Sequence, residues 1–150
     1  MTYDPTRSLV LALQRAAHQV LTAFDDKSRL LDLTPSEMNV LANLMARQPP
    51  TATELARTSG LRPSTLTGVL DRLEEADLVV RTRHPTDRRA VALRLTHAGE
   101  AKARQLVVCL NDYETLLRDA VRVSALQGFH EVTAAIAQVS DAKHSRGNAR

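Results

Sequence analysis

The sequence predicts a mainly α-helical fold with one small β-hairpin. Apolar residues recur at intervals of three and four over most of the chain, which is the period of amphipathic helices. Between Leu78 and Leu95 this period gives way to two short β-prone runs separated by a turn-forming segment. Capping residues, prolines and glycines separate the helical segments from one another. Together these observations predict several helices interrupted by a single hairpin.

Composition places the chain among ordinary globular proteins of single-domain size. It has 150 residues, of which 43% are hydrophobic and 25% are charged. The longest purely apolar run, Leu9–Leu13, is far shorter than the ~20 residues of a membrane span, and the N-terminus lacks the apolar region of a signal peptide. We therefore expect a cytoplasmic protein that does not enter a membrane.

The first predicted helix runs from Pro5 to about Leu30. Its apolar stripe is spaced by four, four, three and four residues and consists of Leu9, Leu13, Ala17, Val20 and Phe24. Such a stripe has to be buried against another surface. The segment Leu31–Leu33 is expected to connect this helix to the next one.

Two capping boxes predict the next two helices. The segment Thr34–Glu37 combines an N-cap threonine, a first-turn proline and a glutamate three residues after the cap. This helix should run to Arg47, because Pro49 and Pro50 cannot continue it. The segment Thr51–Glu54 repeats the capping box for a short helix that ends at Gly60.

The third helix of this stretch begins at Pro63 and has two different faces. Its apolar stripe consists of Leu66, Val69, Leu70 and Leu73, and its polar face consists of Ser64, Thr65, Thr67, Gly68, Asp71, Arg72 and Glu75. Most such patterns indicate only a helix with one solvated face. Here, however, Arg62 and small hydroxyl residues lie at the N-terminal end, and the acids lie toward the far end. Because recognition helices contact bases through their N-terminal residues, this polarity favours entry into the DNA major groove.

Two extended runs, Leu78–Arg83 and Ala90–Leu95, follow the third helix. The second run alternates in polarity, which predicts that every other residue faces the core. The predicted inward residues are Val91, Leu93 and Leu95, and the outward ones are Ala92 and Arg94. The connecting residues 84–89 have the composition of a turn. Helix, helix and hairpin in this order are the layout of a winged helix-turn-helix.

Positive charge is concentrated around this hairpin. The formal net charge of the chain is only +3, yet residues 79–97 contain one acid, Asp87, and five arginines: Arg81, Arg83, Arg88, Arg89 and Arg94. The simplest interpretation is a hairpin with an exposed charged tip, because charges at the edge of a sheet suppress aggregation between sheets. An acid directly before two arginines can in addition orient a guanidinium for insertion into a narrow, negative minor groove. We therefore expect double-stranded DNA as the partner.

The hairpin and its flanks resemble the MarR family of transcriptional regulators. The resemblance covers residues 33–99 in detail and the whole chain in helical layout, and it rests on Val79, Arg81, Asp87, Arg88, Arg89, Leu93, Leu95, Thr96 and Gly99. It implies that Arg89 enters the minor groove, that Asp87 orients it and that Arg88 contacts phosphate. The full predicted DNA-binding set is Arg62, Ser64, Thr65, Thr67, Arg72, Arg81, Arg83, Asp87, Arg88 and Arg89.

Two positions depart from the family pattern. Relatives often have arginine where this chain has Gly68, and they commonly have glycine where Asp77 stands. The first departure removes one possible contact with DNA. The second has little effect, because aspartate tolerates the left-handed backbone conformation.

Two long helices are predicted after the hairpin. Thr96 caps the first, whose stripe is Ala101, Leu106, Leu110, Tyr113, Leu117 and Ala120; Ser124 caps the second, whose stripe is Leu126, Phe129, Val132, Ile136 and Val139. The resemblance implies that residues 1–30 and 97–140 are dimerisation helices around a winged helix-turn-helix domain of residues 31–96. Residues 141–150 are expected to form a flexible tail. Because a two-fold homodimer presents two recognition helices, we expect its DNA target to be a pseudo-palindrome.

The resemblance also implies a repressor that a small ligand releases from DNA. In the family this ligand is often phenolic or aromatic and lies between the dimer helices and the DNA-binding lobe. The candidate pocket residues in this chain are His18, Met38 and Met45.

Other functions have less support in the sequence. The histidines are scattered, and no Cys-x-x-Cys, phosphate-loop or Gly-x-Ser-x-Gly motif is present, so neither catalysis nor a cofactor is expected. A metal-responsive regulator would need His97 and His130 to converge. A winged helix that binds protein is a further alternative. The single cysteine, Cys109, is expected to be a buried, unreactive thiol.

Overall fold

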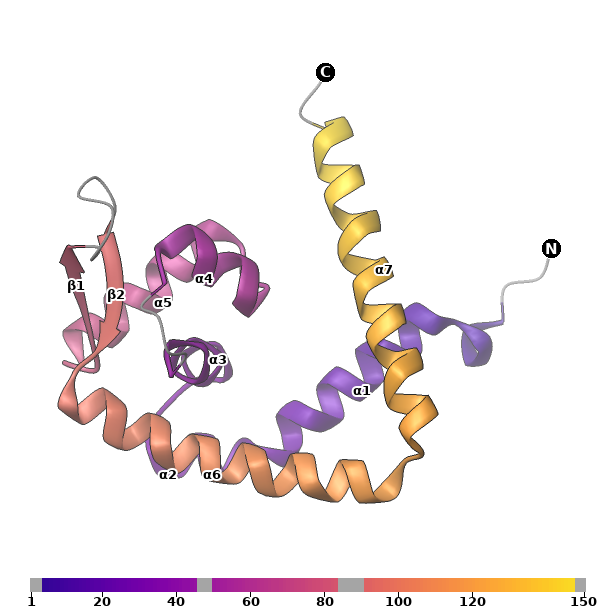
Figure 1. The fold of residues 1–150 in the computed structure, drawn as a ribbon, viewed down its shortest axis with the longest axis horizontal. Coiled ribbons are helices and arrows are strands. Elements are labelled where there is room, and N and C mark those ends of the chain that lie inside the picture. Colours follow the sequence, from indigo (N-terminus) through magenta and orange to yellow (C-terminus); the bar gives the residue numbers. More distant parts are fainter. Residues whose placement is uncertain (1–3, 46–49, 84–90, 148–150) are drawn as a thin grey trace. The chain divides into compact units, whose positions relative to one another are not determined.

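The computed structural model describes residues 4–45, 50–83 and 91–147, with side chains up to residue 140 (Figure 1). The chain divides into two compact units, residues 1–107 and residues 108–150. The first unit contains the helices up to α5, both strands and the first part of α6, and the second contains the rest of α6 and α7. The predicted fold class, mainly helical with a small hairpin, is confirmed.

The N-terminal helix differs from the prediction. In place of one helix from Pro5 to Leu30, the structure has a 3-10 turn η1 (Pro5–Arg7), helix α1 (Leu9–Ala23) and helix α2 (Asp25–Leu31). The break lies at Phe24, whose backbone leaves the helical region at φ −102° and ψ 3°. Two aspartates follow it, and aspartate is unfavourable inside a helix but favourable in a first turn. The acidic pair therefore starts a new helix.

Both predicted capping boxes are present. Helix α3 (Pro35–Leu44) is capped by Thr34 and helix α4 (Ala52–Ser59) by Thr51, each with its glutamate bonded back to the cap. Helix α3 ends before the predicted Arg47, and residues 46–49 lie outside the described part of the chain. Gly60 closes α4 at φ 69°, a left-handed conformation in which glycine carries no steric cost.

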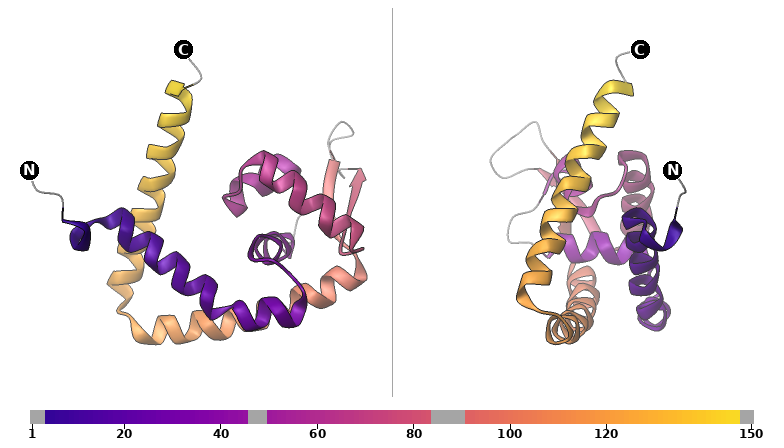
Figure 2. Two further views of the ribbon diagram at one scale, coloured as in Figure 1. Left: turned by 180° about the vertical axis from the view of Figure 1, so that it is seen from behind. Right: turned by 90° about the vertical axis from the view of Figure 1, so that its right-hand side faces the viewer.

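Helix α5 (Pro63–Glu75) buries the stripe that the sequence predicted. Leu66, Val69, Leu70 and Leu73 are each at most 2% exposed. In the views of Figures 1 and 2, α3, α4 and α5 lie next to one another, and each of the three contacts the other two. Just after α5, Asp77 adopts φ 54°, so the departure from glycine at this position is accommodated in the left-handed conformation.

The hairpin pairs strand β1 (Val79–Arg83) with strand β2 (Val91–Leu95) in antiparallel register, and Arg81 lies opposite Leu93. The predicted alternation is only partly correct, because Val91 is 52% exposed and Ala92 is fully buried. Ala92 also takes part in a second pairing. It forms a bridge with Thr51, and the N–H of Leu93 donates to the carbonyl of Pro50 at 2.9 Å, so the far edge of β2 is also covered. Val91 lies opposite Arg83, at the end of the hairpin that adjoins residues 84–90.

Helix α6 (His97–Ala120) is anchored to the end of the hairpin. The hydroxyl of Thr96 accepts the N–H of Gly99 at 3.0 Å, as its predicted capping role requires, and donates to the carbonyl of Asp77 at 2.6 Å. The buried side of α6 in the first unit contains Gly99, Ala103 and Leu106. The predicted stripe was wrong at Ala101, which is exposed, because the buried face passes through Ala103 one turn before Leu106.

None of the described side chains of the second unit is buried. Helix α7 (Val123–Gly147) begins one residue before the predicted cap Ser124, and its backbone remains helical through residues 141–147, where the sequence analysis predicted a tail. No proline or glycine interrupts this segment before Gly147, which favours a helical backbone, and the flexibility of the tail stays a prediction. Cys109 is half-buried, not buried as predicted. Within the described residues, no helix combines the length and apolar character needed to span a bilayer.

Candidate nucleic-acid interface

The N-terminal end of α5 exposes small polar side chains. Pro63 starts the helix, and the buried stripe turns Ser64, Thr65 and Thr67 outward, with the exposed Arg62 directly before them. The hydroxyl of Thr67 donates to the carbonyl of Pro63 at 3.0 Å. Because that donor is used, Thr67 presents only an acceptor oxygen and a methyl group to a partner. Four of the predicted site residues thus share one end of one helix.

A small groove adjoins this end of the helix. It has a volume of about 160 Å³ and is lined by Ala52, Thr53 and Ala56 of α4 and by Pro63, Leu66, Thr67 and Leu70 of α5. Its lining is largely apolar, so it suits a methyl or other small apolar group better than a charged one. The sequence analysis did not identify it, because α4 and α5 form the groove only when they pack together.

Arg72 is engaged within the protein. Its Nε donates to Oε1 of Glu37 at 2.8 Å, and the two residues lie 35 positions apart in the sequence. Glu37 is only 7% exposed, while the side chain of Arg72 is 54% exposed. The other carboxylate oxygen of Glu37 accepts the N–H of Thr34 at 2.7 Å. A residue predicted to face DNA is therefore bonded to the start of α3.

Several interactions act on the ionisation of Glu37. Burial by itself raises the pKa of this carboxyl, because it disfavours the charged form. The backbone hydrogen bond from Thr34 and the bond from Arg72 favour the charged form and outweigh burial, so the pKa lies below its ordinary value. Glu37 is thus a buried carboxylate whose ionised form the surrounding hydrogen bonds stabilise.

Arg81 is also paired. Its Nη2 lies 3.1 Å from Oδ1 of Asp71 and 3.2 Å from Oε2 of Glu74, so one guanidinium of β1 joins two acids of α5. These exposed pairs contribute little to stability on their own, but they set the position of the strand against the helix. Their second effect is to compensate two negative charges beside the polar face of α5.

Other arginines have no acidic partner in the part of the chain that the structure describes. Those in or next to α4, α5 and the hairpin are Arg57 at the end of α4, Arg62, Arg83 at the end of β1 and Arg94 in β2, and all four are exposed. Arg57 was missed by the sequence analysis, although its place in the last turn of a short capped helix indicated an exposed position. The tip residues Asp87, Arg88 and Arg89 lie outside the described residues.

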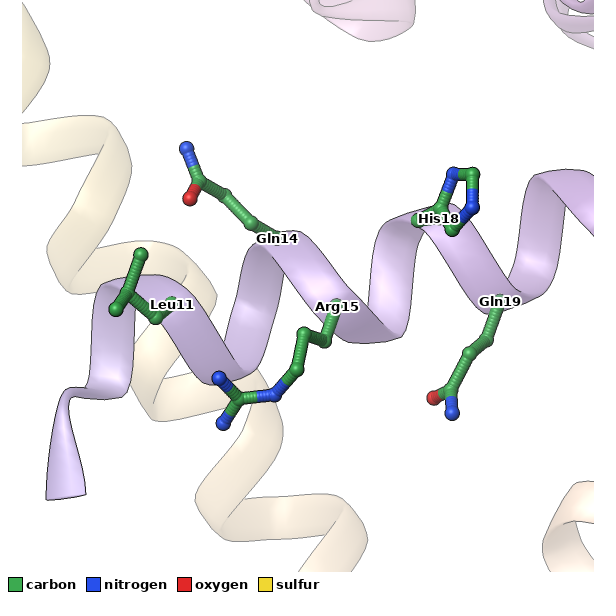
Figure 3. A pocket seen from close by; sticks show the side chains of 5 residues that line it. All are labelled: Leu11, Gln14, Arg15, His18 and Gln19. Atoms are coloured by element: carbon green, nitrogen blue, oxygen red, sulfur yellow. The ribbon is translucent and has the colours of Figure 1, made fainter. Parts of the chain in front are cut away.

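A larger depression lies along α1 (Figure 3). Its volume is about 420 Å³, and the lining residues Leu11, Gln14, Arg15, His18 and Gln19 all come from this one helix. His18, one of the predicted pocket residues, lines this depression, whereas a pocket between the dimer helices and the DNA-binding lobe stays a prediction. The other two predicted pocket residues do not line it, since Met38 is buried in α3 and Met45 is 38% exposed at the end of that helix. The spacing i, i+3, i+4, i+7 and i+8 was the signal available in the sequence.

Metal-binding side chains do not gather in the described part of the protein. No group of three or more His, Cys, Asp or Glu residues suited to hold a metal ion occurs there. His97 belongs to the first unit and His130 to the second, and both are exposed.

Comparison with known proteins connects this geometry to a family. Residues 33–91 match the sequence model of the MarR family. The HTH-type transcriptional repressor MdtR of Bacillus subtilis (strain 168) is 28% identical over 142 residues, which are 92% of this chain and 86% of MdtR. The transcriptional repressor CouR, solved bound to a 23-mer DNA duplex, is 33% identical with a TM-score of 0.67 and covers 88% of this chain and 94% of its own.

A second solved structure shares the fold. NadR, in complex with 4-hydroxyphenylacetate, has a TM-score of 0.77 at 23% identity and covers 93% of this chain and 99% of its own. MdtR and CouR are both transcriptional repressors. These similarities extend over nearly the full chain, and they agree with the capped helices, the exposed start of α5 and the hairpin. The chain belongs to the MarR family of transcriptional regulators.

Proposed function

We propose that the protein is a sequence-specific repressor that binds a pseudo-palindromic DNA operator as a homodimer. The observation that carries the proposal is the exposed N-terminal end of α5, where Arg62, Ser64, Thr65 and Thr67 project away from the buried stripe. In this arrangement α5 enters the major groove and the hairpin reaches the adjacent minor groove. The similarity to CouR, whose solved complex contains a DNA duplex, supports the same partner.

Residue roles follow from charge and position. Ser64, Thr65 and Thr67 contact base edges, and Arg62, Arg83 and Arg88 neutralise phosphates. Arg89 enters the minor groove with Asp87 as its orienting acid. Arg81, which forms ion pairs with two acids of α5, holds the middle of β1 against α5. Each phosphate contact steepens the salt dependence, so log affinity falls with log salt by about 0.9 per contact.

Unpartnered apolar surface supports the homodimer. None of the described side chains of α1 or α7 is buried within the chain. Exposed apolar residues on these helices include Leu9, Val10 and Leu21 of α1 and Phe129, Ile136 and Val139 of α7. Two-fold pairing of a second copy would cover such surface and place two copies of α5 on one side of a duplex. The second copy is thus proposed as the partner of these helices.

A small aromatic or phenolic anion is proposed as the ligand that releases the protein from DNA. The depression on α1 contains Arg15 and His18 beside Leu11, a combination suited to a carboxylate or phenolate attached to an apolar body. NadR, which shares the fold, was solved with 4-hydroxyphenylacetate. Release requires that the ligand favour a dimer whose two copies of α5 no longer match the operator spacing.

The proposed location is the cytoplasm, where a bacterial regulator of this kind would meet chromosomal DNA.

The proposed function is tested by selecting bound duplexes from a random pool, with wild type and Arg89→Ala in parallel. We expect the wild type to enrich a palindrome and Arg89→Ala to lose most of its affinity while it remains folded and dimeric. Equal binding by the variant would remove Arg89 from the site. If the wild type enriches no sequence, the account of a winged helix that binds protein replaces the one proposed here.

A further inference from the structure

We propose that Glu37 is a positioning residue for DNA recognition, and that Arg72 is the brace through which it holds α5 in its reading orientation. This inference rests on the proposed DNA-binding function and concerns the same helix. It changes the role of Arg72 from a DNA contact to an internal support. Arg72 acts as the brace through its ion pair with Glu37.

The geometry of Glu37 leaves its carboxylate little freedom. One oxygen accepts Nε of Arg72 at 2.8 Å, and the other accepts the N–H of Thr34 at 2.7 Å. The residue is 7% exposed and lies in the first turn of α3, where the positive end of the helix dipole favours an anion. The carboxylate is therefore a fixed point to which α5 is attached.

The position of Arg72 on α5 agrees with a supporting role. It lies eight residues after Ser64, which is about 12 Å along the helix from the end proposed to contact bases. Of the nitrogen atoms of its guanidinium, Nε is bonded to Glu37. If Arg72 moved to reach a phosphate, the buried carboxylate would lose this charged partner, which is costly in a buried site.

A second ion-pair group holds the neighbouring face of the same helix. Asp71, adjacent to Arg72, is bonded to Arg81 of β1, and Glu74 one turn further contacts the same guanidinium. The helix is thus attached to α3 by Arg72 and to β1 by Asp71 and Glu74. Because these attachments lie on two sides, rotation or sliding of α5 breaks at least one of them.

The two roles of Arg72 predict opposite effects of Glu37→Gln. If Arg72 contacts phosphate, this variant frees the guanidinium and removes a negative charge near the DNA, so affinity rises. If Arg72 is a brace, the variant loosens α5, and affinity for the selected duplex falls. Glutamine is suited to this test, because it also occurs at the third helical position of capping boxes. Its amide oxygen can accept the N–H of Thr34 as the carboxylate does, so the cap of α3 is retained.

The experiment measures affinity for the duplex selected by the wild type and for a shuffled duplex, over a range of salt concentrations. The proteins are wild type, Glu37→Gln, Arg72→Gln, the double variant and the control Glu100→Gln. The control removes the same charge from an exposed pair, Glu100 with Arg104, in which both residues belong to α6. The ratio of the two affinities is the readout, because partial unfolding lowers both affinities equally and leaves their ratio unchanged.

We expect Glu37→Gln and Arg72→Gln each to lower this ratio by about threefold to thirtyfold, with an unchanged salt slope. The double variant should be no worse than Arg72→Gln, since both changes break one interaction. The control should bind like the wild type. A ratio for Glu37→Gln that equals or exceeds the wild-type ratio overturns the inference, as does a shallower salt slope for Arg72→Gln. If the wild type selects no duplex, the proposed function fails first and the inference fails with it.

Discussion

At the scale of single residues, Glu37 joins two helices that are far apart in the sequence. Its folded-state pKa lies below the usual 4.5, so its contribution to stability is present above that pH and is lost as pH falls through the folded-state pKa. We expect the free energy of unfolding by urea to decrease less between pH 7 and pH 3 in Glu37→Gln than in the wild type. Parallel pH profiles for the two proteins would show that the carboxylate is not stabilised in the folded state.

Gly99 is a residue whose lack of a side chain is required. A Cβ added there would lie 1.9 Å from the carbonyl oxygen of Leu78, which is backbone and cannot move aside. Gly99→Ala should therefore destabilise the protein by about 1–3 kcal/mol or more. The measurement is chemical denaturation of both proteins at one pH.

The matched control for Gly99 is Gly68→Ala. Gly68 lies inside α5, and an added Cβ would be 3.8 Å from Arg72, an ordinary contact. This variant should gain about 0.5–1 kcal/mol from helix propensity. If both variants changed stability equally, the contact between Gly99 and Leu78 would not be the cause of the loss.

At the scale of elements, a substitution just after the C-terminal end of α5 should raise the stability of the protein. Asp77 adopts φ 54°, which favours glycine, and the bond that Thr96 makes there goes to the backbone carbonyl and not to the side chain. Asp77→Gly should retain this bond and raise stability by about 0.5–1 kcal/mol, measured as a higher midpoint of thermal unfolding. A lower midpoint would mean that the Asp77 side chain has a stabilising role.

Helix boundaries were predictable where they depend on local chemistry. The capping boxes at Thr34 and Thr51 and the glycine end of α4 are short-range signals, and each lies where the sequence placed it. The break at Phe24 was missed, because the apolar stripe continued through it. The burial of Ala92 was missed as well, and so was its bridge with Thr51, because Thr51 lies 41 positions earlier in the sequence.

At the scale of the whole molecule, the exposed apolar residues of α7 make the oligomeric state testable. Ile136→Glu places a charge among the apolar side chains of α7 and should weaken the dimer at least tenfold, with loss of operator binding. Sedimentation measures the mass of the variant over a range of concentrations. The control is Gln138→Glu, an exposed position about 200° around the helix. A monomeric wild type, or a dimer unaffected by Ile136→Glu, would contradict the proposed interface.

It was possible to predict from the sequence alone the class of fold, the capped helices, the stripe of α5 and the family, because these depend on periodicity and on residues close together in the chain. Which polar residues remain available to a partner depends instead on how the elements pack. Arg72 and Arg81 look equivalent to Arg62 and Arg83 in the sequence, yet the first two are engaged with acids of other elements. Ion pairs form wherever the fold brings opposite charges together, and for Glu37 and Arg72 that required the packing of α3 against α5.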